Sequence, residues 1–134
     1  MKRFILTIAL LAAFHYATAQ KDYALLVIDV QNFYFPGGRS ELVEPEKVAE
    51  KAAVAIREAR ASGNPVIFIQ HKAATGMEIN ELVAPQPGEK IFVKEEVNSF
   101  LGTGLKEYID SLAIDALVIC GMQTQMCVEA AVRA

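Results

Sequence analysis

The sequence lacks an excess of basic residues. Its 134 residues carry 13 Lys and Arg against 16 Asp and Glu, a formal net charge of −3. Loss of residues 1–19, argued below, removes Lys2 and Arg3 and leaves 11 basic residues against 16 acidic ones. A protein that binds DNA or RNA needs a basic face for the phosphates. We therefore do not expect a nucleic-acid partner.

Long apolar runs are also missing. The mostly apolar run at 4–14 is shorter than the ~20 residues that span a bilayer. It follows Lys2–Arg3 and precedes Ala17–Ala19, the pattern of a secretory signal peptide. We expect cleavage after residue 19 and an exported protein, periplasmic or secreted, without membrane association after cleavage. A buried N-terminal helix or a membrane anchor is the alternative.

Cysteine is scarce, with only Cys120 and Cys127 in the chain. In an exported protein these two residues could form a disulfide. Alternatively, one of them is a reactive thiol. Cys120 lies within an apolar segment, which indicates a packing role, whereas Cys127 follows that segment. The two readings lead to different functions, a thiol redox protein or a cysteine nucleophile.

What remains, residues 20–134, has the length of one small domain and is about half apolar, as in globular proteins. Buried strands are expected at 23–30, 66–69, 91–93 and 116–120, and helices from Pro45 to Gly63, from Gly102 to about Ser111, and from Gln125 onward. This order predicts an α/β fold, a three-layer αβα arrangement around a doubly wound, mostly parallel sheet. Because such sheets normally continue further, we expect the sequence to be truncated after the fourth strand.

Three reactive side chains follow three of these strands: Asp29, Lys94 and Cys127. Parallel strands end at one edge of a sheet, where α/β proteins bind ligands. There a carboxylate could accept a proton, an ammonium could hold that carboxylate, and a thiol could act as nucleophile. Cys127 is expected near a helix N-terminus, which favours the thiolate. Backbone N–H groups in the turn 121–127 could form an oxyanion hole.

Three stretches carry a resemblance to a known family. They are LVIDVQNFYFPGG at 26–38, KEEVNSFLGTGL at 94–105 and LVICGMQTQMCV at 117–128. In this order and spacing they resemble the isochorismatase-like cysteine hydrolases, which include nicotinamidases and carbamoyl-group amidohydrolases. The resemblance extends over about residues 22–134.

The resemblance implies a catalytic triad of Asp29, Lys94 and Cys127. The thiol would attack a carbonyl carbon, the carboxylate would pass its proton to the leaving amine, and water would hydrolyse the thioester. It also implies a cis peptide between Met122 and Gln123. The backbone N–H groups of Gln123 and Cys127 would then serve as oxyanion donors.

Some positions resemble the family less closely. Tyr34 and Phe100 lie where members place aromatic residues that line the substrate pocket, and Phe33 stands where many have Asp. With His71 as the one histidine beyond the leader, the metal site of nicotinamidases is not expected, and no cofactor is implied. The presence of Cys127 favours C–N hydrolysis over vinyl-ether cleavage. Members are commonly oligomeric, so a homo-oligomer is an expectation about partners.

The sequence thus predicts a cysteine-dependent hydrolase of a small amide or ureido compound. Two alternatives remain, a noncatalytic small-molecule binding domain of the same fold and a redox protein using Cys120 and Cys127. His71, just after the second strand, is either the base of a Cys–His pair or, as we favour, a partly buried histidine bonded to a loop.

Overall fold

The computed structural model describes residues 23–134. The expected signal peptide, and with it the start of the expected domain at residue 20, lies outside the described residues. The elements are β1 (Tyr23–Ile28), η1 (Asn32–Tyr34), α1 (Pro45–Ala61), β2 (Val66–His71), η2 (Glu81–Val83), β3 (Lys90–Lys94), α2 (Leu105–Ser111), β4 (Ala116–Gly121), η3 (Thr124–Val128) and α3 (Glu129–Arg133). Among residues 23–134, no helix is both long enough and apolar enough to cross a bilayer.

The four strands form one parallel sheet in the order β3-β2-β1-β4. At its centre, Leu26 of β1 aligns with Ile67 of β2 on one side and with Ile119 of β4 on the other. Both β1 and most of β2 are buried on both faces, which explains their continuous apolar sequences. The parallel sheet expected from the sequence is therefore present.

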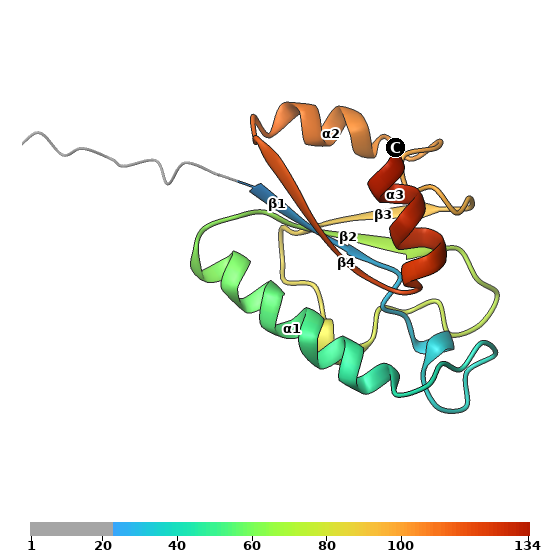
Figure 1. The fold of residues 1–134 in the computed structure, drawn as a ribbon. Helices are drawn as coiled ribbons and strands as arrows, with labels where there is room; N and C mark the ends of the chain where they lie inside the picture. Colours follow the sequence, from blue (N-terminus) through green and yellow to red (C-terminus); the bar gives the residue numbers. More distant parts are fainter. Residues whose placement is uncertain (1–22) are drawn as a thin grey trace, which may run out of the picture.

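Helices cover both faces of this sheet (Figure 1). On one face α1 packs with Leu25 and Val27 of β1. On the other face lie α2 and α3, where Leu105 and Ala131 pack with Leu26. Alternate residues of β1 thus enter two separate cores, because successive side chains of a strand point to opposite faces. This is the three-layer αβα fold that the sequence predicts.

The α2 helix begins later than expected. The sequence pattern places its start at Gly102, but the helix begins at Leu105. Gly102 and Gly104 have φ angles of 68° and 72°. This left-handed conformation suits glycine and is incompatible with an α-helix. The two glycines therefore form the turn before the helix and are not part of it.

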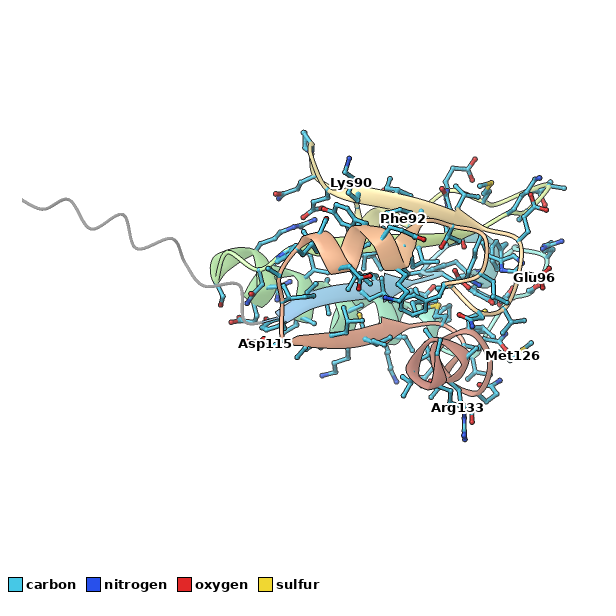
Figure 2. The ribbon with its side chains drawn as sticks, turned by 90° about the horizontal axis from the view of Figure 1, so that it is seen from above. Lys90, Phe92, Glu96, Asp115, Met126 and Arg133 are labelled. Atoms are coloured by element: carbon cyan, nitrogen blue, oxygen red, sulfur yellow. The ribbon has the colours of Figure 1, made fainter. Side chains whose placement is uncertain are left out.

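The chain reverses its direction across the sheet at β1. From β1 it runs outward to β2 and β3, and it then returns to place β4 on the opposite side of β1. Figure 2 shows Glu96, just beyond β3, and Met126, in the segment after β4, at one end of the molecule, while Asp115, just before β4, lies at the other end. The carboxyl ends of β1 and β4 therefore form a topological switch point, where α/β sheets place their ligand sites.

Candidate active site

Asp29 follows β1 directly and lies at this switch point. Its side chain is 0% exposed and its φ is 51°, a left-handed conformation that non-glycine residues seldom adopt. Two backbone hydrogen bonds hold the residue there: its N–H donates to Ile69 O at 3.0 Å, and its carbonyl accepts from Gln31 N at 2.9 Å. Such strain persists only where the surroundings impose it, and it clusters at functional sites.

Lys94 ends β3 and reaches across β2 to this carboxylate. Its Nζ lies 2.9 Å from Oδ2 of Asp29 and 3.2 Å from Sγ of Cys127. The carbonyl oxygens of Glu96 and Val97 also accept from it, at 3.1 and 3.4 Å. Because the lysine side chain is 0% exposed, its charge is balanced by these groups and not by water.

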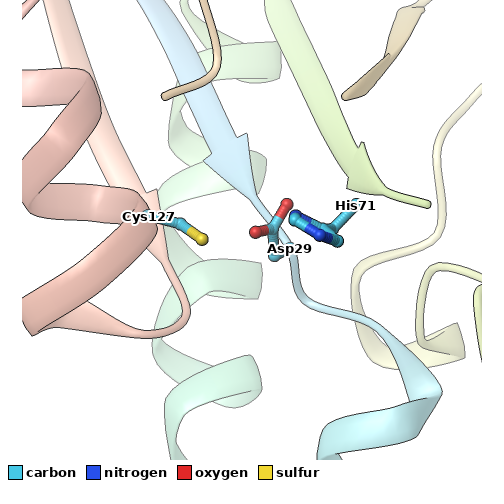
Figure 3. A group of neighbouring side chains, drawn as sticks. All are labelled: Asp29, His71 and Cys127. Atoms are coloured by element: carbon cyan, nitrogen blue, oxygen red, sulfur yellow. The ribbon is translucent and has the colours of Figure 1, made fainter. Parts of the chain in front are cut away.

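Cys127 enters the same cluster from the far side. It lies in η3, a π-helical turn that follows β4 and continues into α3. Figure 3 shows its sulfur directed toward Asp29, with the imidazole of His71 on the other side of the carboxylate. The thiol residue is 5% exposed, more than Asp29 or Lys94. The three residues that the sequence places after strands are thus brought together, and Cys127 is the most exposed of the three.

The environment changes the proton affinities of this cluster. Burial raises the pKa of Asp29 above its ordinary value, although the adjacent Lys94 acts in the opposite direction. Burial and the neighbouring Asp29 likewise raise the pKa of the Cys127 thiol, and Lys94 offsets only part of this. Our expectation that a helix N-terminus would favour the thiolate was therefore wrong, because burial and the nearby carboxylate dominate. The Cys127 thiol therefore holds its proton more strongly than an ordinary cysteine does.

The Met122–Gln123 peptide bond, next to this cluster, is cis. Before it, Gly121 has a φ of 131°, and a Cβ there would lie 1.9 Å from Ile28 O. Met122 N–H donates to the same Ile28 oxygen at 2.8 Å, which fixes the turn to the end of β1. A hollow of about 210 Å³ adjoins the cis peptide; its lining residues are Leu42, Val43, Val48 and 121–125.

The two aromatic residues expected to line a pocket pack in the two different cores of the sheet. Tyr34, in η1, is buried against Phe33, with ring centroids 4.3 Å apart. Burial, followed by the charges of Cys127 and Asp29, raises the pKa of Tyr34 to about 12. Phe100 is half-buried and packs against the core that contains Cys127.

Sequence reasoning did not identify Gln31, and it placed His71 against a loop. Nδ1 of His71 lies 2.9 Å from Lys94 Nζ, inside the cluster. Gln31 is fully buried, and its amide bonds both the N–H and the carbonyl of His71. The sequence does show a glutamine two residues after Asp29, which could have indicated a role for Gln31. Its burial, however, depends on how the end of β2 packs against it, and the sequence alone does not reveal this.

Asp29, His71 and Cys127 are also the described residues whose arrangement could hold a metal ion. One ligand atom from each lies within 4.8 Å of the others. Lys94 Nζ, however, contacts all three side chains. The Lys94 ammonium therefore supplies the positive charge that lies among these three side chains.

The two cysteines face opposite sides of the sheet. Cys120 packs against the core under α1, whereas Cys127 belongs to the core on the α2 and α3 side. Both thiols are free. Burial raises the pKa of Cys120 to about 11. This arrangement supports a packing role for Cys120 and disfavours a redox pair.

Comparison with known proteins identifies the family. Residues 23–134 match the model of the isochorismatase domain. The chain is 40% identical over 121 residues to YddQ, an uncharacterized isochorismatase family protein of Bacillus subtilis, with 82% of this chain and 67% of YddQ covered. It is 31% identical over 119 residues to streptothricin hydrolase of Streptomyces noursei, with 82% and 43% covered.

The fold comparison agrees. N-carbamoylsarcosine amidase from Thermoplasma acidophilum superposes with a TM-score of 0.75 at 26% identity, with 81% of this chain and 72% of that chain covered. A candidate isochorismatase hydrolase from Oleispira antarctica gives 0.80 at 37%, with 84% and 67% covered. This chain spans about two thirds of YddQ and less than half of the streptothricin hydrolase. The chain belongs to the isochorismatase-like cysteine hydrolase family.

Proposed function

We propose that the chain is a cysteine-dependent hydrolase that cleaves a C–N bond of a small amide or ureido compound. The observation that carries this proposal is the position of Lys94 Nζ, 2.9 Å from Asp29 Oδ2 and 3.2 Å from Cys127 Sγ. A nucleophile, a base and a cation meet there at the switch point of the sheet. Two similar proteins, the streptothricin hydrolase and the N-carbamoylsarcosine amidase, bear names of hydrolytic activities.

In the first half of this mechanism, Cys127 Sγ attacks the substrate carbonyl carbon while Asp29 takes the thiol proton. The raised pKa of Asp29 suits this role, because a more basic carboxylate accepts the proton more readily. The C–N bond then breaks, Asp29 protonates the departing nitrogen, and an acyl thioester remains on the sulfur. Lys94 stays near the sulfur and pairs with Asp29 whenever that residue is a carboxylate.

In the second half, water attacks the thioester carbon and Asp29 accepts one of its protons. The C–S bond breaks, the proton returns to the sulfur, and the acid product leaves. Backbone N–H groups of Gln123 and Cys127 are the proposed donors to the oxyanion in both halves. Tyr34 and Phe100 are the proposed walls of the substrate site, since the charges of Cys127 and Asp29 act on Tyr34 and Phe100 packs against the core that contains Cys127.

The test is hydrolysis of a panel of primary amides and N-carbamoyl amino acids, and the release of ammonia or amine measures the rate. Cys127→Ala should lower kcat/KM by about 10³-fold or more, as removal of a nucleophile does. Cys120→Ala is the matched control and should keep most of the activity, because this thiol packs on the opposite face. Mass spectrometry of rapidly quenched wild type should show an acyl adduct on residue 127.

Two outcomes would contradict the proposal. Turnover that survives Cys127→Ala would exclude the cysteine mechanism. Saturable binding of panel compounds without any turnover would instead favour the noncatalytic binding domain.

Export is a further part of the proposal, supported by the sequence pattern of residues 1–19 alone. Expression of the full chain in a bacterial host with periplasmic fractionation should yield a protein whose N-terminus is Gln20. An intact Met1 in the cytoplasmic fraction would contradict it.

A further inference from the structure

His71 is the one histidine among residues 23–134, and the proposed mechanism does not use it. It ends β2, between the strands that carry Asp29 and Lys94. Figure 3 shows its imidazole facing the Asp29 carboxylate from the side opposite Cys127. Its Nδ1 lies 2.9 Å from Lys94 Nζ. Which of these two nitrogen atoms donates the hydrogen bond depends on the protonation states of the two residues.

The donor and the acceptor follow once Lys94 is taken in its ammonium form. A lysine ammonium has three hydrogens and no lone pair, so it can only donate. The Nδ1 atom must therefore present its lone pair, which makes the imidazole neutral with its hydrogen on Nε2. Burial and the adjacent Lys94 hold the pKa of His71 below its ordinary value, which is consistent with this protonation state.

Gln31 holds the backbone of His71 in place. The buried Gln31 side chain accepts the N–H of His71 at 2.7 Å and donates to its carbonyl at 2.9 Å. The same amide nitrogen donates to Met77 O at 2.5 Å. Because Gln31 lies two residues after Asp29, these bonds set the end of β2 relative to the carboxylate. The histidine is thus built into the cluster and does not merely reach it from a flexible loop.

The ammonium has more neighbours than hydrogens. Its contacts are Asp29 Oδ2, His71 Nδ1, Cys127 Sγ, and the carbonyl oxygens of Glu96 and Val97. In the proposed reaction Asp29 alternates between carboxylate and carboxylic acid. When it is protonated, the ion pair that holds Lys94 is lost. A neutral imidazole acceptor does not change during this cycle and can hold the ammonium through it.

We propose that His71 is a positioning residue that holds the Lys94 ammonium between Asp29 and Cys127 through its neutral Nδ1. The inference rests on the proposed hydrolase function for its role in turnover, but its effect on the sulfur is separate. A held ammonium favours the thiolate of Cys127, since an opposite charge nearby stabilises an ionised thiol. A protonated imidazole would lose the acceptor and place a second cation against Lys94.

Charged groups on several elements act on the proton affinity of this imidazole. Lys94 on β3 and Arg39 in the loop after η1 disfavour its protonation, whereas Asp29 after β1 and Glu96 after β3 favour it. Asp29 also titrates within the cluster. A loss of activity at low pH (the acid limb of the pH profile) could therefore come from protonation of His71 or of Asp29. The test must separate these two causes.

The experiment compares wild type, His71→Leu, His71→Gln and the control Lys72→Gln. Lys72 is the adjacent residue, and its exposed side chain pairs with Glu95 at 2.7 Å. The first readout needs no substrate: the rate of Cys127 alkylation by iodoacetamide from pH 5 to 10, followed by peptide mass spectrometry. The second is the pH profile of kcat/KM on a panel substrate that is hydrolysed.

We expect His71→Leu to alkylate about tenfold more slowly at pH 7, because less thiolate forms when the ammonium is not held beside the sulfur. His71→Gln supplies an acceptor oxygen that does not titrate. It should restore most of the lost rate and remove the histidine's share of the acid limb, while Lys72→Gln behaves as wild type. If His71 had only a structural role, glutamine would not be expected both to restore the alkylation rate and to change the acid limb of the pH profile.

The proposal is overturned if all four proteins share one alkylation profile, or if His71→Gln keeps the full acid limb, which would assign that limb to Asp29. Should His71→Leu fail to fold, the glutamine variant still decides. Failure of the proposed function is a separate result. In that case no panel compound is hydrolysed, yet Cys127 alkylation still depends on residue 71 in the expected way.

Discussion

The ammonium nitrogen of Lys94 lies 2.9 Å from Oδ2 of Asp29, and neither side chain is exposed to solvent. The two residues belong to β3 and to the end of β1, which are separated by β2 in the sheet. The pair therefore ties together three strand ends at the switch point. Breaking a buried ion pair by removing one partner leaves the other charge without compensation.

Lys94→Met should for this reason lower the free energy of unfolding by about 3–5 kcal/mol. Urea unfolding at pH 7, followed by circular dichroism, measures this cost. Lys106→Met is the matched control, because Lys106 pairs with Asp110 at 2.7 Å on the exposed surface. Its cost should be much smaller than that of Lys94→Met, because water screens an exposed ion pair. Equal costs for the two variants would show that the buried pair is not structurally important.

The ion pair between Arg60 and Glu89 predicts a pH effect. Burial alone would raise the pKa of Glu89, but hydrogen bonds from Arg60 and from the N–H of Gln86 hold it below its ordinary value of 4.5. A lowered folded-state pKa means that its stabilisation is present above pH 4.5 and is lost as the pH falls through the folded-state value.

Glu89→Gln should accordingly cost about 1 kcal/mol at pH 7, where the carboxylate is ionised, and much less near pH 3. Urea unfolding of wild type and variant at both pH values gives the two differences. A cost that stays constant with pH would show that the folded-state pKa of Glu89 is not lowered.

Gly121 combines two demands that only glycine meets. Its φ is 131°, and a Cβ would lie 1.9 Å from the backbone oxygen of Ile28. Gly121→Ala should therefore destabilise the fold by more than about 4 kcal/mol, which for a small domain means little soluble protein.

Gly102→Ala separates the two demands. Gly102 has a φ of 68°, but nothing lies within 4 Å of the Cβ position, so only the backbone penalty of about 1–2 kcal/mol applies. Expression yield and urea unfolding compare the variants. Similar losses would mean that the close approach of β4 to β1 relaxes at little cost.

The Cys120 thiol should be unreactive in the folded protein. Its pKa of about 11 leaves little thiolate at pH 8, and the thiolate is the reactive form. In the Cys127→Ser variant, iodoacetamide should label Cys120 about two orders of magnitude more slowly than a free thiol. Unfolding in urea should restore the ordinary rate. Labelling at the ordinary rate without urea would show that the pKa of this thiol is not raised.

Much of the fold could be predicted from local sequence. The apolar run in 23–30 indicates a strand buried on both faces, and the period of apolar residues after Pro45 indicates an amphipathic helix; β1 and α1 occupy these places. The alternation of these elements predicts a parallel sheet, and a parallel sheet brings Asp29 and Lys94 to one edge. Strand and helix preferences act over a few residues, so the chain order alone reveals them.

The rest depends on distances between segments far apart in the chain. Local sequence was enough to predict the α/β fold, the resemblance to the family, and the positions of Asp29, Lys94 and Cys127 after three strands. The contact of His71 with Lys94 and the raised pKa of the Cys127 thiol became evident from the folded chain. The reason is physical: burial and charge at a site are set by every segment that packs around it, whereas a residue's place on a strand or helix is set by its neighbours in sequence.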